Sequence, residues 1–264
     1  MNATRAIDVN ADMGESFGRW SLGDDAALMP YISSANVACG AHAGDPATMR
    51  ATTALAAEHG VQVGAHVGLP DLLGFGRRRM AVTPDEVRDL VLFQLGSLQA
   101  FAAAAGTTVR HVKPHGALYA MASSDPDLAT AVAAAMRAVD PSLVLLLLGD
   151  PGVSAARAAG VEAVSEAFPD LEYTPDGQLV IERTKRAWDP GRVAERALRL
   201  ARDHELEAQD GSTLRIDAPT LCVHGDAPNA VDVARAVRRR LEDAGFELRP
   251  LSPGTPPHAG APER

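Results

Sequence analysis

The sequence predicts an α/β fold in which seven parallel strands close into a barrel. Short apolar segments alternate with stretches of helical periodicity along most of the 264 residues. Parallel strands covered by helices are buried on both faces, so they appear as continuous apolar runs. Most of these runs end in a polar residue, usually beside glycine, as expected where strand ends form one site. The candidate strands are Ile7–Asn10, Ala35–Cys39, Val61–His66, Val109–His115, Leu143–Gly149, Val161–Glu166 and Thr220–His224.

The composition is typical of one barrel domain. A hydrophobic content of 46% allows one large core, and a single α/β barrel typically takes roughly 250 residues. We therefore expect one domain over residues 1–249 and a disordered Pro- and Gly-rich tail over residues 250–264. The formal net charge of −9 argues against a nucleic-acid surface. The apolar runs are too short for a membrane helix and the two cysteines make no disulfide framework, so we expect a cytoplasmic protein.

Four helices have a clear beginning in the sequence. An N-cap side chain followed by proline satisfies one free backbone amide and presets the first helical φ. This pattern occurs at Asp45-Pro46, Thr83-Pro84, Asp125-Pro126 and Asp189-Pro190. Asn229 is the candidate cap of the last helix. The segment Phe168–Arg186 interrupts the alternation of strands and helices, and its apolar residues indicate a hairpin beside the site.

The residue pattern of the first strand predicts polar side chains inside the barrel. Alternate residues of a strand share a face, so Asp8 and Asn10 point away from their apolar neighbours, and Asp12 and Glu15 follow them. The spacing resembles a calcium loop, but Arg19 stands where a bidentate Glu is required, so we reject that reading. Either these residues belong to the site or they satisfy loop amides as buried polar groups.

The second and third strands end in histidines. Asn36 and His42 lie in the stretch from Ser34 to Asp45, whose following helix has an N-terminus suited to a substrate carboxylate, and His66 closes the third strand. Two imidazoles and the Asp12 carboxylate are common ligands of a divalent metal. The alternative is that both histidines are hydrogen-bonded core residues. Cys39 is either a nucleophile beside His42 or a small hydrophobe.

The remaining strand ends carry one lysine and further polar groups. Burying Lys113 requires an anionic partner, which is a substrate group, a phosphate, or Asp8 or Asp12 in a structural ion pair. His115 follows Lys113 by two positions. Glu166 ends the sixth strand, and the last strand ends in His224 and Asp226.

These motifs together resemble the LamB/YcsF family, to which the A subunits of bacterial 5-oxoprolinase belong. The resemblance extends to about Leu248. The matching stretches are Asp8 to Glu15, Ser34 to Asp45, Gly64-Ala65-His66 with Pro70-Asp71 and Gly74-Phe75-Gly76-Arg77, Arg110 to Tyr119, and Cys222 to Asp226.

The resemblance implies an irregular seven-stranded barrel of the glycoside hydrolase/deacetylase type. It also implies opening of the lactam of 5-oxoproline to L-glutamate, coupled to ATP hydrolysis, together with two further subunits. The substrate would be a small anionic lactam and ATP a cosubstrate. The sequence has no Gly-x-x-x-x-Gly-Lys-Ser/Thr loop, so ATP binding by this chain alone or jointly with its partners stays open.

The resemblance and the strand-end chemistry together assign roles to the candidate residues. A lactam carbonyl reacts only when its oxygen is phosphorylated or polarised, which calls for positive charge. The expected catalytic residues are Asp12, Glu15, Lys113 and His115, with Asp12 or Glu15 acting on water. The expected substrate-binding residues are Asn10, Asn36, His42, His66, Arg77, Glu166, His224 and Asp226. The candidate metal ligands are His42, His66 and Asp12.

The sequence departs from the family pattern around the expected pocket. The departures lie at Ala41, at Val67-Gly68-Leu69, at Leu171 in Asp170-Leu171-Glu172-Tyr173, and at Lys185-Arg186 in Arg183-Thr184-Lys185-Arg186-Ala187, and they remove an arginine that could hold the substrate carboxylate. A related cyclic amide is therefore an alternative substrate. Two other functions stay open: a metal-dependent amide hydrolase or deacetylase that acts without ATP, and a non-catalytic subunit that binds partner proteins.

Overall fold

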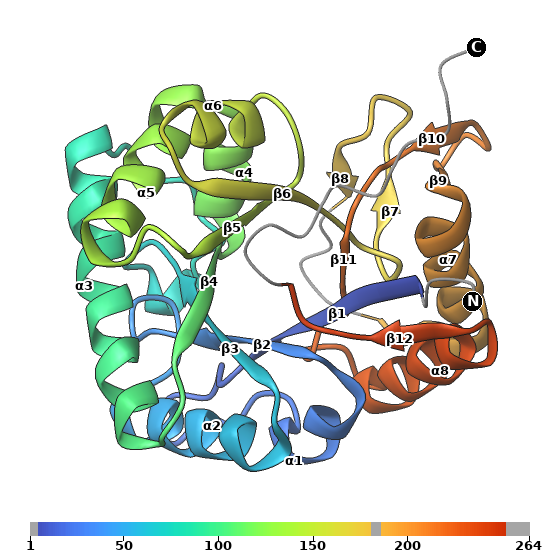
Figure 1. Ribbon diagram of the computed structural model, residues 1–264, viewed down its shortest axis with the longest axis horizontal. Coiled ribbons are helices and arrows are strands. Elements are labelled where there is room, and N and C mark those ends of the chain that lie inside the picture. Colours follow the sequence, from blue (N-terminus) through green and yellow to red (C-terminus); the bar gives the residue numbers. More distant parts are fainter. Residues whose placement is uncertain (1–4, 181–185, 252–264) are drawn as a thin grey trace.

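The computed structural model describes residues 5–180 and 186–251, in which strands alternate with helices. Seven strands correspond to the predicted ones, with their ends shifted by a few residues (Figure 1). They are β1 Arg5–Met13, β2 Ser34–Ala38, β3 Gln62–Val67, β4 Val109–Pro114, β5 Val144–Leu147, β6 Glu162–Ala167 and β11 Thr220–Cys222.

The seven strands form a closed parallel barrel, as predicted. Their order is β1-β2-β3-β4-β5-β6-β11, and β11 pairs with β1 to complete the circle. The register sets Asn10 beside Ser34 of β2 and Cys222 of β11, while Asp12 lies beside Asn36. Since all strands run the same way, their carboxyl ends meet at one rim.

One strand of the main sheet was not predicted. β12, Phe246–Leu248, pairs in parallel with the amino-terminal part of β1, where Arg5 lies beside Phe246. It is attached outside the closed circle, at the end of the barrel opposite the polar strand ends. Three residues are too few for a periodic apolar signal.

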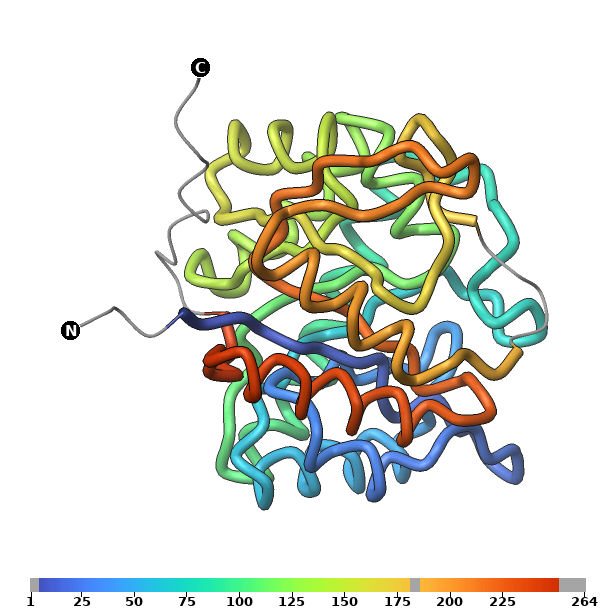
Figure 2. Tube along the Cα trace, turned by 90° about the vertical axis from the view of Figure 1, so that its right-hand side faces the viewer, coloured from blue at the N-terminus to red at the C-terminus, as the bar shows by residue number. Residues whose placement is uncertain are grey.

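Helices surround the barrel (Figure 1). The predicted caps are present, because Asp45, Thr83, Asp125 and Asp189 each accept hydrogen bonds from the first helical turn. Figure 2 shows α7 and α8 lying side by side in orange and red. The helices are α1 Asp25–Leu28, α2 Pro46–His59, α3 Pro84–Ala104, α4 Gly116–Ser124, α5 Pro126–Val139, α6 Gly152–Ala158, α7 Pro190–Asp203 and α8 Ala230–Asp243, with the 3₁₀ turns η1 Met29–Tyr31 and η2 Leu72–Gly74.

Two short hairpins follow β6. The first, β7 Glu172–Tyr173 with β8 Leu179–Val180, is antiparallel and lies in the segment for which a hairpin was predicted. The second, β9 Glu205–Glu207 with β10 Thr213–Arg215, was not predicted. Part of the first segment, residues 181–185, and most of the expected disordered tail, residues 252–264, lie outside the described residues.

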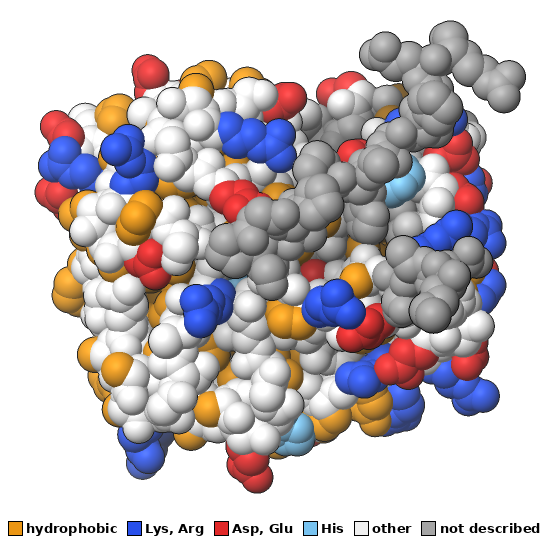
Figure 3. Space-filling model, viewed as in Figure 1, with side chains coloured by type: hydrophobic (Ala, Val, Ile, Leu, Met, Phe, Trp, Pro, Cys, Tyr) orange, Lys and Arg blue, Asp and Glu red, His pale blue; other side chains and the backbone are white. Residues whose placement is uncertain are grey.

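The interior of the barrel is polar near the strand ends, whereas the layer between strands and helices is apolar. Ile7 and Val9 belong to the hydrophobic core, and Asp8 and Asn10 alternate with them and are buried among polar side chains. On the face in Figure 3, blue and red side chains are interspersed. Across the described ranges, no helix has the length and apolar character needed to cross a membrane.

Candidate functional site at the carboxyl rim of the barrel

The deepest polar layer of the barrel surrounds Asp8. Its carboxylate accepts hydrogen bonds from the hydroxyls of Ser33, Ser34 and Thr220, at 2.7, 2.8 and 2.5 Å. Burial outweighs these bonds and raises the pKa of Asp8 to about 6. Asp8 therefore has a local structural role and is not the partner of Lys113.

The next layer is a chain of amide hydrogen bonds. Asn10 donates to Glu166 Oε1 and to Thr220, both at 2.7 Å, and accepts a bond from Asn36 Nδ2 at 2.7 Å. Asn36 also donates to Asp12 Oδ1 at 2.9 Å and accepts a bond from His111 Nε2 at 2.7 Å. The alternation of β1 thus produces a connected network that ends at Asp12.

Lys113 forms the charged centre of the site. Its Nζ lies 3.1 Å from Asp12 Oδ1, 3.1 Å from Glu166 Oε1 and 2.9 Å from Cys222 Sγ. Burial opposes its charge, but Asp12, Cys222 and Glu166 raise the pKa of Lys113 well above its ordinary value. Of the two ion pairs considered from the sequence, the one with Asp12 is present.

Four buried side chains form a histidine cluster: Glu15, His42, His66 and His115. Glu15 Oε1 lies 3.5 Å from His42 Nε2, 3.8 Å from His66 Nε2 and 3.4 Å from His115 Nδ1. The rings of His42 and His115 stack with centroids 3.7 Å apart. These four residues are a candidate metal site. Asp12, the third expected ligand, contacts the cluster through His66 Nε2 at 3.3 Å.

Two glycines make room for the histidine cluster. A Cβ on Gly68 would lie 2.5 Å from His42 Nδ1, and one on Gly76 would lie 2.8 Å from atoms of both His42 and His115. Gly76 also has a φ of +64°, which side chains rarely adopt. The glycines near the strand ends thus allow backbone to approach the imidazoles closely.

Two side-chain contacts with carboxylates lie at the rim. His224 Nδ1 is 3.1 Å from Asp170 Oδ2, and its backbone N–H donates to the same carboxylate at 2.8 Å. Arg77 Nη2 lies 2.8 Å from Asp226 Oδ2 and so joins the loop after β3 to the loop after β11. A second group of possible metal ligands comprises Asp12, Cys222 and His224.

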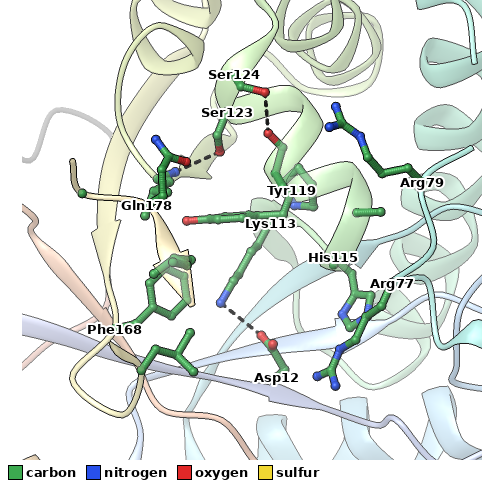
Figure 4. Close-up of a pocket in the computed structure, with 18 of the residues that line it drawn as sticks. Asp12, Arg77, Arg79, Lys113, His115, Tyr119, Ser123, Ser124, Phe168 and Gln178 are labelled. Carbon is green, nitrogen blue, oxygen red and sulfur yellow. Dashed lines mark hydrogen bonds and ion pairs between the residues drawn. The ribbon is translucent and has the colours of Figure 1, made fainter. Parts of the chain in front are cut away.

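These groups surround a cavity of about 560 Å³. Figure 4 shows Lys113 pointing to Asp12, with Phe168 on one side and His115 and Arg77 on the other. The lining residues are Asp12, His66, Arg77, Arg79, Lys113, Pro114, His115, Gly116, Ala117, Tyr119, Ala120, Ser123, Ser124, Leu148, Asp150, Pro151, Phe168, Leu171, Asp176, Gly177, Gln178, Leu179 and His224.

The structure divides the expected site residues into two sets. Six line the cavity: Asp12, His66, Arg77, Lys113, His115 and His224. The other six lie behind its wall or below its floor: Asn10, Glu15, Asn36, His42, Glu166 and Asp226. The second set holds members of the first in place through the contacts given above.

The structure decides between the two roles of Cys39 and contradicts the expected cap of α8. Cys39 is a small hydrophobe of the core and not a nucleophile, because its thiol is buried, contacts Val37 O at 3.1 Å, and has a pKa that burial raises to about 12. Asn229 does not cap α8 with its side chain. Its amide instead bonds to the backbone N–H and C=O of Trp188, at 3.2 and 2.7 Å, and ties the start of α8 to the segment before α7.

Several lining or supporting residues were missed in the sequence. Phe168 lies directly after β6, with its ring 5.2 Å from Lys113 Nζ, and Asp170 positions His224. Arg79 stands in a run of three arginines, and His111 precedes Lys113 by two positions on the same strand. The alternation of β4 points His111 and Lys113 to the same side, a signal that could have identified His111.

Comparison with known proteins identifies the family. The model of the LamB/YcsF family matches residues 7–255. The chain belongs to the LamB/YcsF family. One relative in this family, the 5-oxoprolinase A-subunit 3 of Pseudomonas syringae pv. tomato, is 53% identical over 251 residues, which cover 94% of this chain and 98% of the relative. Another, the 5-oxoprolinase A-subunit of Thermus thermophilus, is 50% identical over 92% of this chain and 98% of its own length.

A solved structure agrees with this family membership. The crystal structure of the lactam utilization protein of Thermus thermophilus superposes with a TM-score of 0.86 at 48% sequence identity, covering 92% of this chain and 99% of that one. The irregular barrel expected for LamB/YcsF proteins is therefore the fold of this chain.

Proposed function

We propose that this chain is the A-subunit of an ATP-dependent 5-oxoprolinase, which opens the lactam of 5-oxoproline or a related cyclic amide to give L-glutamate. Relatives that carry the name of this 5-oxoprolinase component match it over nearly its whole length. The observation that carries the proposal is the position of Lys113, a buried cation in the cavity wall, held between Asp12 and Glu166.

The chemistry requires such a cation. A lactam carbonyl carbon is a poor electrophile, and transfer of the γ-phosphoryl group of ATP to the carbonyl oxygen releases ADP and activates it. Water then adds to the carbon, the C–N bond breaks with a proton going to nitrogen, and a second water releases phosphate from the acyl phosphate. Negative charge develops on oxygen in these steps, and a fixed cation stabilises it.

The lining residues divide this work. We assign stabilisation of the oxyanion or phosphate to Lys113 together with His115 and His224, which line the same cavity. Of the two carboxylates considered for water, Asp12 lines the cavity, so the water that attacks is oriented by Asp12. Glu15 lies behind the histidines and supports them.

The substrate carboxylate is assigned to the arginine side of the cavity. Arg77 and Arg79 line this side, and Asp226 fixes the Arg77 guanidinium. Arginine binds carboxylates with charge-assisted, often bidentate, hydrogen bonds. These two residues would take the place of the arginine that the family pattern has in the segment after β6 and that this chain lacks.

The cosubstrate and the partners complete the proposal. ATP would bind jointly to this chain and to two further subunits, since relatives are named as one component of an enzyme. We place the complex in the cytoplasm, where ATP is available and where the free cysteines Cys39 and Cys222 stay reduced.

The test is reconstitution with the two presumed partner subunits, followed by measurement of ADP and glutamate release with 5-oxoproline. We expect Lys113→Ala to lower turnover by about 10²–10³-fold, while Arg239→Ala, which removes an 83% exposed cation on α8, leaves it unchanged. Unchanged turnover in Lys113→Ala would refute the assignment. Glutamate release by the chain alone without ATP would favour the metal-dependent amide hydrolase, and no turnover with any lactam would favour the non-catalytic role.

A further inference from the structure

We propose that Glu15, His42, His66 and His115 bind one divalent transition-metal ion, with Zn²⁺ as the representative ion. This site is part of the cavity wall, because His66 and His115 line the cavity and the other two ligands lie behind them. The proposal concerns a property of the chain alone and does not depend on which lactam it opens.

Hydrogen bonds to backbone carbonyls determine which nitrogen of each lining histidine carries the hydrogen. His66 Nδ1 lies 3.0 Å from the carbonyl of Lys113, and His115 Nε2 lies 2.8 Å from the carbonyl of Phe75. A carbonyl oxygen only accepts hydrogen bonds, so both of these nitrogens must be donors. In a neutral imidazole the opposite nitrogen then carries a lone pair.

The two lone-pair nitrogens point at each other. His66 Nε2 and His115 Nδ1 are 2.9 Å apart, a distance that two lone pairs do not tolerate without a cation between them or beside them. The neighbouring atoms are carboxylate oxygens, which only accept hydrogen bonds when they are ionised: Asp12 Oδ2 lies 3.3 Å from His66 Nε2 and Glu15 Oε1 lies 3.4 Å from His115 Nδ1. Acceptors therefore converge on one point inside the protein.

His42 extends this convergence. Neither of its ring nitrogens has a hydrogen-bond partner among the described residues, and the side chain is fully buried. Glu15 Oε1 is also buried without a hydrogen-bond partner there. Buried polar atoms without partners are rare in proteins and are often explained by an ion or a water.

The spacing fits a tetrahedral ion. Bonds of about 2.0–2.2 Å to nitrogen and oxygen place neighbouring ligand atoms about 3.3 Å apart. The measured separations from Glu15 Oε1 are 3.4, 3.5 and 3.8 Å, and the four ligand atoms all lie within 4.8 Å of one another. The carbonyls of Lys113 and Phe75 orient the imidazoles in the way that second partners of metal-binding histidines usually do. Three imidazoles and a carboxylate suit Zn²⁺ and related ions better than Mg²⁺ or Ca²⁺.

The experiment uses the full chain, stripped with a chelator and titrated with Zn²⁺ and, for spectroscopy, with Co²⁺. We expect one equivalent of Zn²⁺ bound after gel filtration, a rise in Tm, and a Co²⁺ absorption spectrum typical of tetrahedral nitrogen and oxygen ligands. His42→Ala and Glu15→Gln should each weaken Zn²⁺ binding by more than about 100-fold, with native circular dichroism as the check on folding.

His224→Ala is the matched control, because this rim histidine belongs to the other group of possible ligands with Asp12 and Cys222. We expect it to keep full Zn²⁺ affinity. Loss of binding in His224→Ala with retention in His42→Ala would overturn the proposal, and so would a Co²⁺ spectrum with a thiolate band. Absence of stoichiometric binding by the folded wild-type chain would also overturn it, and would mean that a proton alone bridges His66 and His115. These outcomes are independent of lactam turnover.

Discussion

Replacing Lys113 by methionine tests how the charged centre is held together. Its Nζ lies 3.1 Å from both Asp12 Oδ1 and Glu166 Oε1, and Lys113 and Glu166 are fully buried or nearly so. At an effective dielectric constant of 20, each pair contributes about 5 kcal/mol of Coulomb attraction. The cost of removing the charges from water offsets much of this gain. Methionine keeps most of the length of the side chain but removes its charge, so two carboxylates are left without their common cation.

The expected result is a lower free energy of unfolding. Breaking a buried ion pair from one side typically costs about 3–5 kcal/mol, which is a large part of the about 5–15 kcal/mol of a typical domain. Neutralising one of the stranded carboxylates should recover part of this loss. We therefore expect Lys113→Met/Glu166→Gln to be about 1–3 kcal/mol more stable than Lys113→Met alone.

The assay is urea unfolding of the wild type, Lys113→Met, Glu166→Gln and the double variant, followed by circular dichroism. This double-mutant cycle isolates the coupling between the two residues. If Lys113→Met unfolds within about 1 kcal/mol of the wild type, or if the double variant shows no recovery, the buried ion pairs do not hold the site as argued.

Three further predictions concern the polar layer around Asp8, the packing of the barrel strands and the cavity lining. The pKa of the Asp8 carboxyl is raised from 3.8 to about 6, so the folded chain binds the carboxyl proton more tightly than the unfolded chain does. The folded state should therefore lose about 3 kcal/mol of stability as the pH rises from about 4 to about 7. Urea unfolding should show this loss in the wild type and not in Asp8→Asn. Gly64→Ala should destabilise the barrel by more than about 2 kcal/mol, because its Cβ would lie 1.9 Å from His111 Nε2. The control, Gly96→Ala, lies on the exposed side of α3 with open space around it and should stabilise the fold by about 0.5–1 kcal/mol. Equal changes in Tm for the two variants would contradict this prediction. Arg79→Gln should raise KM for the lactam about 10-fold with little change in kcat, and a loss confined to kcat would assign Arg79 a different role.

The strand positions could be predicted because each is a local property of the chain. An apolar run that ends in a polar residue beside glycine contains its own signal, and the common direction of the strands then brings the polar ends to one rim. Lys113, His66 and Asp12 are therefore found together, although they come from three strands. The helix starts could be predicted for the same reason, because the cap residue and the proline after it are adjacent in the sequence.

The partner of each polar residue could not be predicted, because pairing depends on depth and register inside the barrel. Asp8 and Asp12 both face inward from β1, and the sequence does not distinguish them as partners of Lys113. In the structure, three hydroxyls surround Asp8 in the deeper layer, so only Asp12 is available to the lysine. The pairing of His224 with Asp170 likewise joins residues 54 positions apart.

The groups that act on the carbonyl lie on the strands, whereas part of the cavity wall lies in loops, so substrate specificity can change without a change in these groups. Asp12 is held by Asn36, Lys113 and His66, all of which lie on strands, so its orientation depends on barrel register. Leu171, one of the positions that differ from the family pattern, and Leu179 both line the cavity from the segment after β6. Substitutions there change the shape of the cavity wall without altering the strand ends. A related lactam could therefore be accepted while the groups that act on its carbonyl stay in place.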